Sequence, residues 1–291
     1  MEKIFQRSTF PKASGGNLYE WNDAETKFYV PENGKYLIKI IASAKNSQQN
    51  KSKDDDDLRL RLDNYEFGKY EIHDEQISWK GFGTGSSWDG AILKGGTKTI
   101  YFFVELQKSS HVLKFFADET PIIQELSIYK LSSGELFEIE ELKPPQNILT
   151  DKKGIPWVSF VFLGVKAKNV ALATIVYSAA QKKTTDGDNL KIVLNGKILK
   201  NKKALTSNKY KNFYFSGDLN QGKSELLTIH PEQFAFLEDS LELWYDGQPS
   251  FYLNFELFDS IQAWMEAEIP EKVKLDFYEW ALGISVKILS K

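Results

Sequence analysis

The sequence predicts an all-β chain of two tandem jelly-roll-like β-sandwiches, followed by a short C-terminal helical segment. Short strand-like runs separated by turn residues, and an internal repeat of those runs, are the observations behind this prediction. Residues 58–62, Leu-Arg-Leu-Arg-Leu, alternate between apolar and charged, as a strand with one buried face does. The runs 28–30 and 36–41 flank the turn sequence Pro-Glu-Asn-Gly, which is typical of a β-hairpin. Many short strands with turns between them favour a sandwich or jelly roll.

The internal repeat consists of four sequence blocks that recur in the same order. The matched blocks are 41–44 with 176–179, 56–63 with 188–195, 100–106 with 213–219, and 115–121 with 243–249. Only the lengths between the blocks differ, as expected for related domains that diverge in their loops. The first copy carries an insertion-like, glycine-rich stretch at 65–99.

The length of 291 residues supports two domains rather than one. The expected division is a tail at 1–16, a first sandwich at 17–131, a linker at 132–154, a second sandwich at 155–258 and a helical segment at 259–291. In the last segment, Asp259 is a plausible N-cap, and Ile261, Trp264 and Met265 have helical spacing. This segment either packs on the second sandwich or offers an apolar face to a partner or further domain.

Composition narrows the classes of partner and chemistry. A net charge of −3 argues against binding to nucleic acid, because the chain has no basic field for phosphates. With no cysteines, the sequence has no disulfides, thiolate metal ligands or cysteine nucleophile. We expect no transmembrane segment, and no signal peptide is visible at the N-terminus.

The first candidate ligand site lies in the glycine-rich stretch. Trp79 and Trp88 could each lay an indole ring against a sugar, while Ser87 and Asp89 could hydrogen-bond its hydroxyls. The alternative interpretation is that both tryptophans cap the edge of the sandwich.

The second candidate site lies at matched points of the two copies. Asp118 and Asp246 each stand three residues before a proline, where a carboxylate either bonds turn backbone or contacts a sugar or metal. Trp244 and Tyr245 are adjacent in a predicted strand, so only one of them can face solvent.

Metal binding and catalysis receive little support from the sequence. The acidic run 54–57 and the segment 186–188 leave a structural calcium site open, although a solvated loop is the favoured interpretation of the run. No other cofactor is expected. The three histidines lie in no catalytic pattern, and nothing indicates the paired carboxylates of a glycosidase. The chain is therefore predicted not to be an enzyme.

Residues 19–25 and 28–36 resemble the opening of jelly-roll, galactose-binding-like carbohydrate-binding modules. Residues 87–90, Ser-Trp-Asp-Gly, and 115–121 are similar to modules that precede bacterial cell-wall hydrolase and peptidase domains. The resemblance covers about 17–131 and, more faintly, 155–258. It implies a non-catalytic module that binds polysaccharide or peptidoglycan at the cell surface or outside the cell, as the accessory part of a larger hydrolase. The alternative is a structural or adhesive surface module that binds protein partners.

Overall fold

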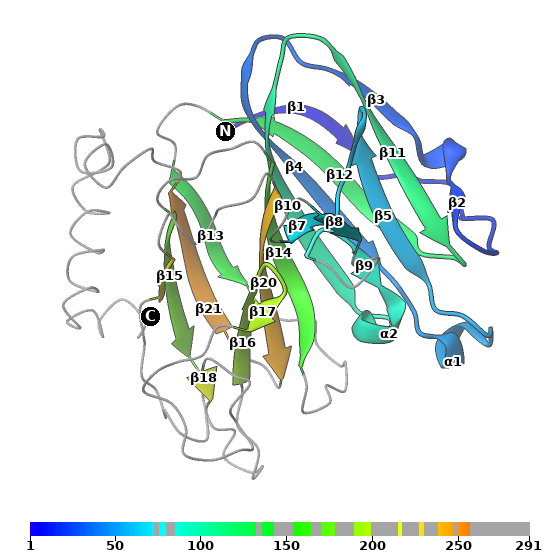
Figure 1. Cartoon of the computed structure of the whole chain (residues 1–291). Coiled ribbons are helices and arrows are strands. Elements are labelled where there is room, and N and C mark those ends of the chain that lie inside the picture. Colours follow the sequence, from blue (N-terminus) through cyan, green and yellow to red (C-terminus); the bar gives the residue numbers. More distant parts are fainter. Residues whose placement is uncertain are drawn as a thin grey trace.

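The chain forms a set of mostly antiparallel sheets, as the computed structural model in Figure 1 shows. The structure describes residues 1–72, 76–79, 85–131, 136–142, 154–163, 170–177, 189–198, 215–216, 227–229, 238–246 and 250–256. Strands dominate these residues, so the predicted all-β sandwich class is confirmed. Among the described residues, no helix is long and apolar enough to cross a membrane.

The described residues of the first half of the chain form twelve strands and three short helices. They are β1 (Glu2–Arg7), β2 (Tyr19–Glu20), η1 (Asn22–Ala24), β3 (Thr26–Tyr29), β4 (Gly34–Ser43), α1 (Ser47–Asn50), β5 (Asp57–Leu62), β6 (Tyr65–Glu66), β7 (Lys69–Ile72), β8 (Gln76–Trp79), β9 (Trp88–Asp89), α2 (Gly90–Leu93), β10 (Thr97–Leu106), β11 (Ser110–Asp118) and β12 (Ile122–Lys130). The second half contributes β13 (Leu136–Leu142), β14 (Ile155–Leu163), β15 (Val170–Tyr177), β16 (Asn189–Leu194), β17 (Lys197–Ile198), β18 (Phe215–Ser216), β19 (Leu227–Ile229), β20 (Glu238–Asp246) and β21 (Ser250–Glu256).

The second half repeats the strand pairing of the first. In the first half, β1-β12-β4-β10 lie in one sheet and β11-β5-β6 in another, with β2 and β3 both paired to β11. In the second half, β13-β21-β15-β19 form one sheet, and β14-β20-β16-β17 follow the order of the other. The register agrees as well, because Asp57 faces Asp118 on β11 and Asn189 faces Asp246 on β20. Those are the residues that the sequence repeat equates.

One block of the repeat is placed wrongly by the sequence comparison. The block 213–219 was expected to correspond to β10, but Phe215 pairs with Leu190 of β16. Trp88 pairs with Leu58 of β5 at the corresponding register, so β18 is the counterpart of β9. Strand β19, which pairs with β15 as β10 pairs with β4, takes the place of β10. A short aromatic run fits either strand, and the pairing partner decides between them.

The two halves join through a parallel pairing of β10 with β14, which creates one nine-stranded sheet. Along this seam Tyr101 stacks on Phe160 and Phe103 on Phe162, with ring centres 5.4 and 5.2 Å apart. Strand β14 is buried along nearly all its length, as expected for a strand in the middle of a large sheet. The proposed division into domains at residue 131 therefore separates halves that share a sheet.

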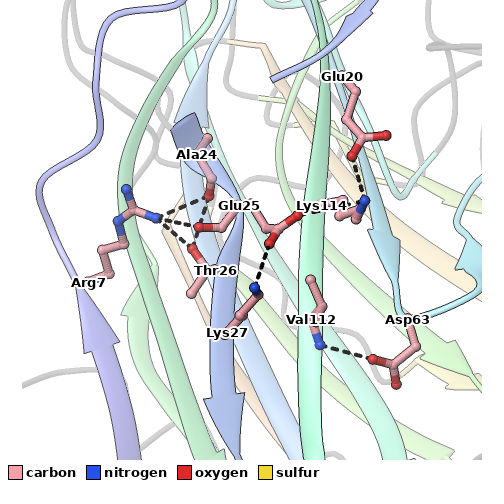
Figure 2. A network of polar contacts seen from close by, with 9 residues as sticks. All are labelled: Arg7, Glu20, Ala24, Glu25, Thr26, Lys27, Asp63, Val112 and Lys114. Carbon is pink, nitrogen blue, oxygen red and sulfur yellow. Dashed lines mark hydrogen bonds and ion pairs between the residues drawn. The ribbon is translucent and has the colours of Figure 1, made fainter. Parts of the chain in front are cut away.

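Two expectations for the connecting segments are wrong. Residues 2–7 of the predicted tail form β1, which pairs with β12, and residues 136–142 of the predicted linker form β13, which pairs with β21. The guanidinium of Arg7 fastens β1 by donating to the carbonyls of Ala24 and Glu25 and to Thr26 Oγ1, as Figure 2 shows. The predicted helical segment 259–291 lies outside the described residues.

The core of the first half lies between its two sheets. Strand β5 alternates as predicted, with Leu58, Leu60 and Leu62 buried and the residues between them half-buried on the outer face. Phe67 reaches across to Phe102 of β10, and the ring centres lie 4.7 Å apart. The side chains of β5 and β11 that do not enter this core therefore lie on the outer face of their sheet.

Candidate functional site

Trp88 and Ser87 belong to the interior, and this corrects their predicted role in ligand binding. The Trp88 side chain is 0% exposed, and its Nε1 donates to the Lys98 carbonyl at 2.8 Å. Ser87 is also buried, and its carbonyl accepts from Lys98 Nζ at 2.9 Å. With no open ring face, the Trp88 indole cannot stack on a sugar.

The stretch around these residues binds the second half of the chain instead. Glu238 of β20 accepts hydrogen bonds from Tyr65 Oη at 2.9 Å and from the Gly68 amide at 3.0 Å. Lys98 and Glu242 form a buried ion pair with 2.9 Å between Nζ and Oε1. We call the residues 65–68, 85–87 and Lys98 the clamp, because they hold the first half against β20.

Burial makes the clamp an unusual electrostatic environment. Glu238 is 1% exposed, and this burial raises the pKa of its carboxyl to about 7 despite hydrogen bonds from Ser86, Gly68 and Tyr65. Lys98 and Glu242 compensate each other's charge. The contact between the halves is thus polar and closely packed.

Asp89 and Trp79 have local structural positions. Asp89 is the N-cap of α2, and its carboxylate accepts from the Ile92 amide at 3.1 Å. Trp79 ends β8, where it pairs with Lys69, but its side chain lies outside the described residues. Its predicted role in stacking stays a prediction.

The alternation expected in β20 is confirmed. Tyr245 is 1% exposed, packs edge-on against Trp157, and burial raises the pKa of its hydroxyl to about 12. Trp244 is half-buried and points to the opposite face of the strand. Tyr245 is therefore a core residue, whereas Trp244 keeps some contact with solvent. The Asp246 side chain lies outside the described residues.

A pair of facing residues, one aromatic and one cationic, recurs at the same register in both halves. In the first half Phe116 faces Arg59, and the guanidinium carbon lies 5.8 Å from the ring centre. In the second half Trp244 faces Lys191, and Nζ lies 3.6 Å from the ring centre. Two residues further along, Asp118 and Asp246 follow the aromatic side chains on β11 and β20. We call this arrangement the aromatic–cation–acid motif.

The motif of the first half lies on an outer sheet face lined by charged side chains. Arg61 also lies over the Phe116 ring, at 5.2 Å. Lys114 donates to Glu20 at 2.6 Å, as Figure 2 shows, and this hydrogen bond lowers the pKa of the Glu20 carboxyl. Figure 1 places β5 and β11 on the far side of the molecule from β13, β15 and β21. The half-buried Phe116 ring, surrounded by hydrogen-bond donors and acceptors, can therefore contact a ligand on this face.

Three aspartates form a row across neighbouring strands beside Phe116. Asp57 faces Asp118 on one side and Asp89 on the other. Burial, with the nearby Asp89 carboxylate, raises the pKa of Asp57 to about 7, and burial also raises the pKa of Asp89 and of Asp118. Within the described part of the chain, no three acidic or histidine side chains converge as metal ligands would.

Within the acidic run 54–57, Asp54 is exposed, as a solvated loop would have it, but Asp56 is buried, and this corrects the favoured interpretation at that residue. Asp56 is 1% exposed and accepts from the Lys45 amide at 3.0 Å, Asn50 Nδ2 at 2.7 Å and the Thr120 amide at 2.8 Å. These bonds hold the β4–β5 connection together and tie it to the turn between β11 and β12. The carboxylates of the run thus accept hydrogen bonds from backbone amides at this end of the sandwich.

Phe116 and Arg59 were missed as candidates by reasoning from the sequence. The repeat aligns Phe116 with Trp244 and Arg59 with Lys191, so the signal was present in the matched blocks.

Comparison with known proteins leaves the family open. No protein-family model matches the chain, and no curated protein sequence matches it. Among solved structures, the chain is similar to a carbohydrate-binding module from Cellvibrio mixtus lichenase 5A, solved in complex with cellotriose. The match has 15% identity and a TM-score of 0.22, and it covers 45% of this chain and 93% of the module.

Proposed function

We propose that the protein is a non-catalytic glycan-binding protein whose ligand lies on the outer face of β5 and β11. The observation that carries the proposal is the aromatic–cation–acid motif of Phe116, Arg59 and Asp118. The ligand class is a neutral polysaccharide or cell-wall glycan, and an accessory role beside a hydrolase domain belongs to the same proposal.

The chemistry of the motif suits a sugar ring. A half-buried aromatic ring offers apolar area at low entropic cost to the C–H face of a pyranose. Arg59 and Arg61 donate in fixed planar geometry, and Asp118 accepts, so hydroxyls at the rim of the sugar can be paired. Asp118 is half-buried at the end of β11, so its carboxylate remains within reach of a ligand hydroxyl.

The test is binding of the purified chain to peptidoglycan, chitin, cellulose and soluble glycans, compared with Phe116→Ala and Asp118→Asn. We expect Phe116→Ala to weaken binding at least tenfold, about 1.4 kcal/mol, because the stacking surface is lost. Tyr29→Ala is the matched control, since this 56% exposed ring lies on β3, which pairs with the other end of β11.

The outcomes separate the site from the function. Binding that survives both Phe116→Ala and Asp118→Asn would place the ligand elsewhere. If the wild-type chain binds no glycan at all, the proposal fails, and recognition of a protein partner becomes the better explanation.

A further inference from the structure

The second half carries the same motif in a different setting. Trp244 and Lys191 occupy the register of Phe116 and Arg59, and the cation lies closer to the ring, at 3.6 Å rather than 5.8 Å. Tryptophan presents a larger stacking surface than phenylalanine. By its residues alone, the second motif is at least as suitable for a sugar as the first.

The neighbouring residues on the two strands decide whether a ligand can reach each motif. Two positions before the aromatic residue, β11 has Lys114, which is about 30% exposed, whereas β20 has Glu242, which is 7% exposed. Glu242 is paired with Lys98 of the clamp, and its Oε2 also accepts from Trp244 Nε1 at 3.3 Å. Lys191 is only 7% exposed. The clamp thus packs directly beside the second motif.

We infer that Trp244 and Lys191 form a second site for the same class of glycan, which the clamp of the first half holds closed. This inference rests on the proposed function. It means that the intact chain binds one ligand, on the face of Phe116, and gains a second site when the clamp moves off β20.

The clamp has one close contact with β20 that a single added methyl group would disrupt. A Cβ atom added at Gly85 would lie 2.6 Å from both Cβ and Oγ of Ser240, two residues from Glu242 on the same face of β20. Such a separation is below any van der Waals contact, so in Gly85→Ala the segment 85–87 and the Ser240 side of β20 must move apart. Tyr65→Ala loosens the clamp independently, because it removes the hydroxyl that donates to Glu238.

The experiment is isothermal titration of the full chain with an oligosaccharide that the wild type binds. We expect one site per chain in the wild type and two in Gly85→Ala and in Tyr65→Ala, with one site restored in Gly85→Ala/Trp244→Ala. Gly34→Ala is the matched control and should keep one site, because the nearest atom to its added Cβ is 4.0 Å away. Hydrogen exchange at 238–246 reports whether the clamp has opened.

Each result has a defined meaning. One site in both clamp variants, with faster exchange at 238–246, overturns the inference while leaving the proposed function intact. Two sites in the wild type also overturn it, because the second motif would then be open. A wild type that binds no glycan contradicts the proposed function instead.

Discussion

Trp88 is a core side chain whose polar atom is also satisfied. Its ring is fully buried, its Nε1 donates to the Lys98 carbonyl, and its backbone pairs with Leu58 of β5. A large buried ring fixed at both ends contributes to stability through area and packing together.

Trp88→Ala should therefore lower the free energy of unfolding by about 3–5 kcal/mol, because it leaves a cavity between the sheets. Trp88→Phe should cost less, since it keeps most of the volume and loses only the hydrogen bond from Nε1 to the Lys98 carbonyl. Urea unfolding measures both, with the exposed Tyr29→Ala as control, expected within about 0.5 kcal/mol of the wild type. A Trp88→Ala chain of unchanged stability that no longer bound glycan would restore this residue to the ligand site.

At the scale of elements, the two faces of β20 lie in different environments. Its Leu241, Leu243 and Tyr245 side chains lie in the core of the second half, while Glu238 and Glu242 are buried under the clamp. A strand buried on both faces usually reads as a continuous apolar run, and β20 instead alternates because the clamp supplies polar partners.

The pH dependence of stability should reveal the contact of β20 with the clamp. The Glu238 carboxyl has a pKa of about 7 in the folded chain, against an ordinary value of 4.5. Its contribution is complete below pH 4.5 and is lost as the pH rises through 7, because the buried carboxylate must then be charged. We expect the chain to be more resistant to urea at pH 5 than at pH 8.

Glu238→Gln should reduce that difference by on the order of 2–3 kcal/mol, since glutamine carries no charge at either pH. The exposed Glu105→Gln is the matched control and should leave the difference unchanged. An equal pH dependence in the wild type and in Glu238→Gln would mean that Glu238 is solvated.

Elements with strong alternation were predictable from the sequence, and those at sheet edges were not. The run 57–62 predicts a strand, the observed β5, because every second residue is leucine and the intervening ones are charged. Strand β1 was not predicted because its residues are mostly polar or exposed, and β13 was not predicted because its run is acidic. The clamp could not be predicted, since a glycine-rich loop with tryptophans has the same composition whether it faces a ligand or a neighbouring domain.

At the scale of the whole molecule, the halves are joined by the β10–β14 seam and by the buried pair of Lys98 and Glu242. Each of these connects residues more than 50 positions apart in the chain. Because the ion pair is buried, its two charges depend on each other far more than an exposed pair would.

Lys98→Met should lower the free energy of unfolding by about 3–5 kcal/mol, because it leaves Glu242 charged and unpaired in the interior. The double variant Lys98→Met/Glu242→Leu should recover most of that loss, since no buried charge remains. Thermal and urea unfolding of the single and double variants close the cycle. A Lys98→Met chain as stable as the wild type would show that water reaches Glu242.

The parallel pairing of β10 with β14 also bears on how such a chain is inherited. Cut apart, each half would present a long apolar strand with unsatisfied backbone groups, which is a template for aggregation. Neither half can then be transferred between proteins as an independently folding module, in the way that domains on flexible linkers are. Recombination that preserves solubility must move both copies as one cassette, and any fusion partner belongs outside them rather than between them.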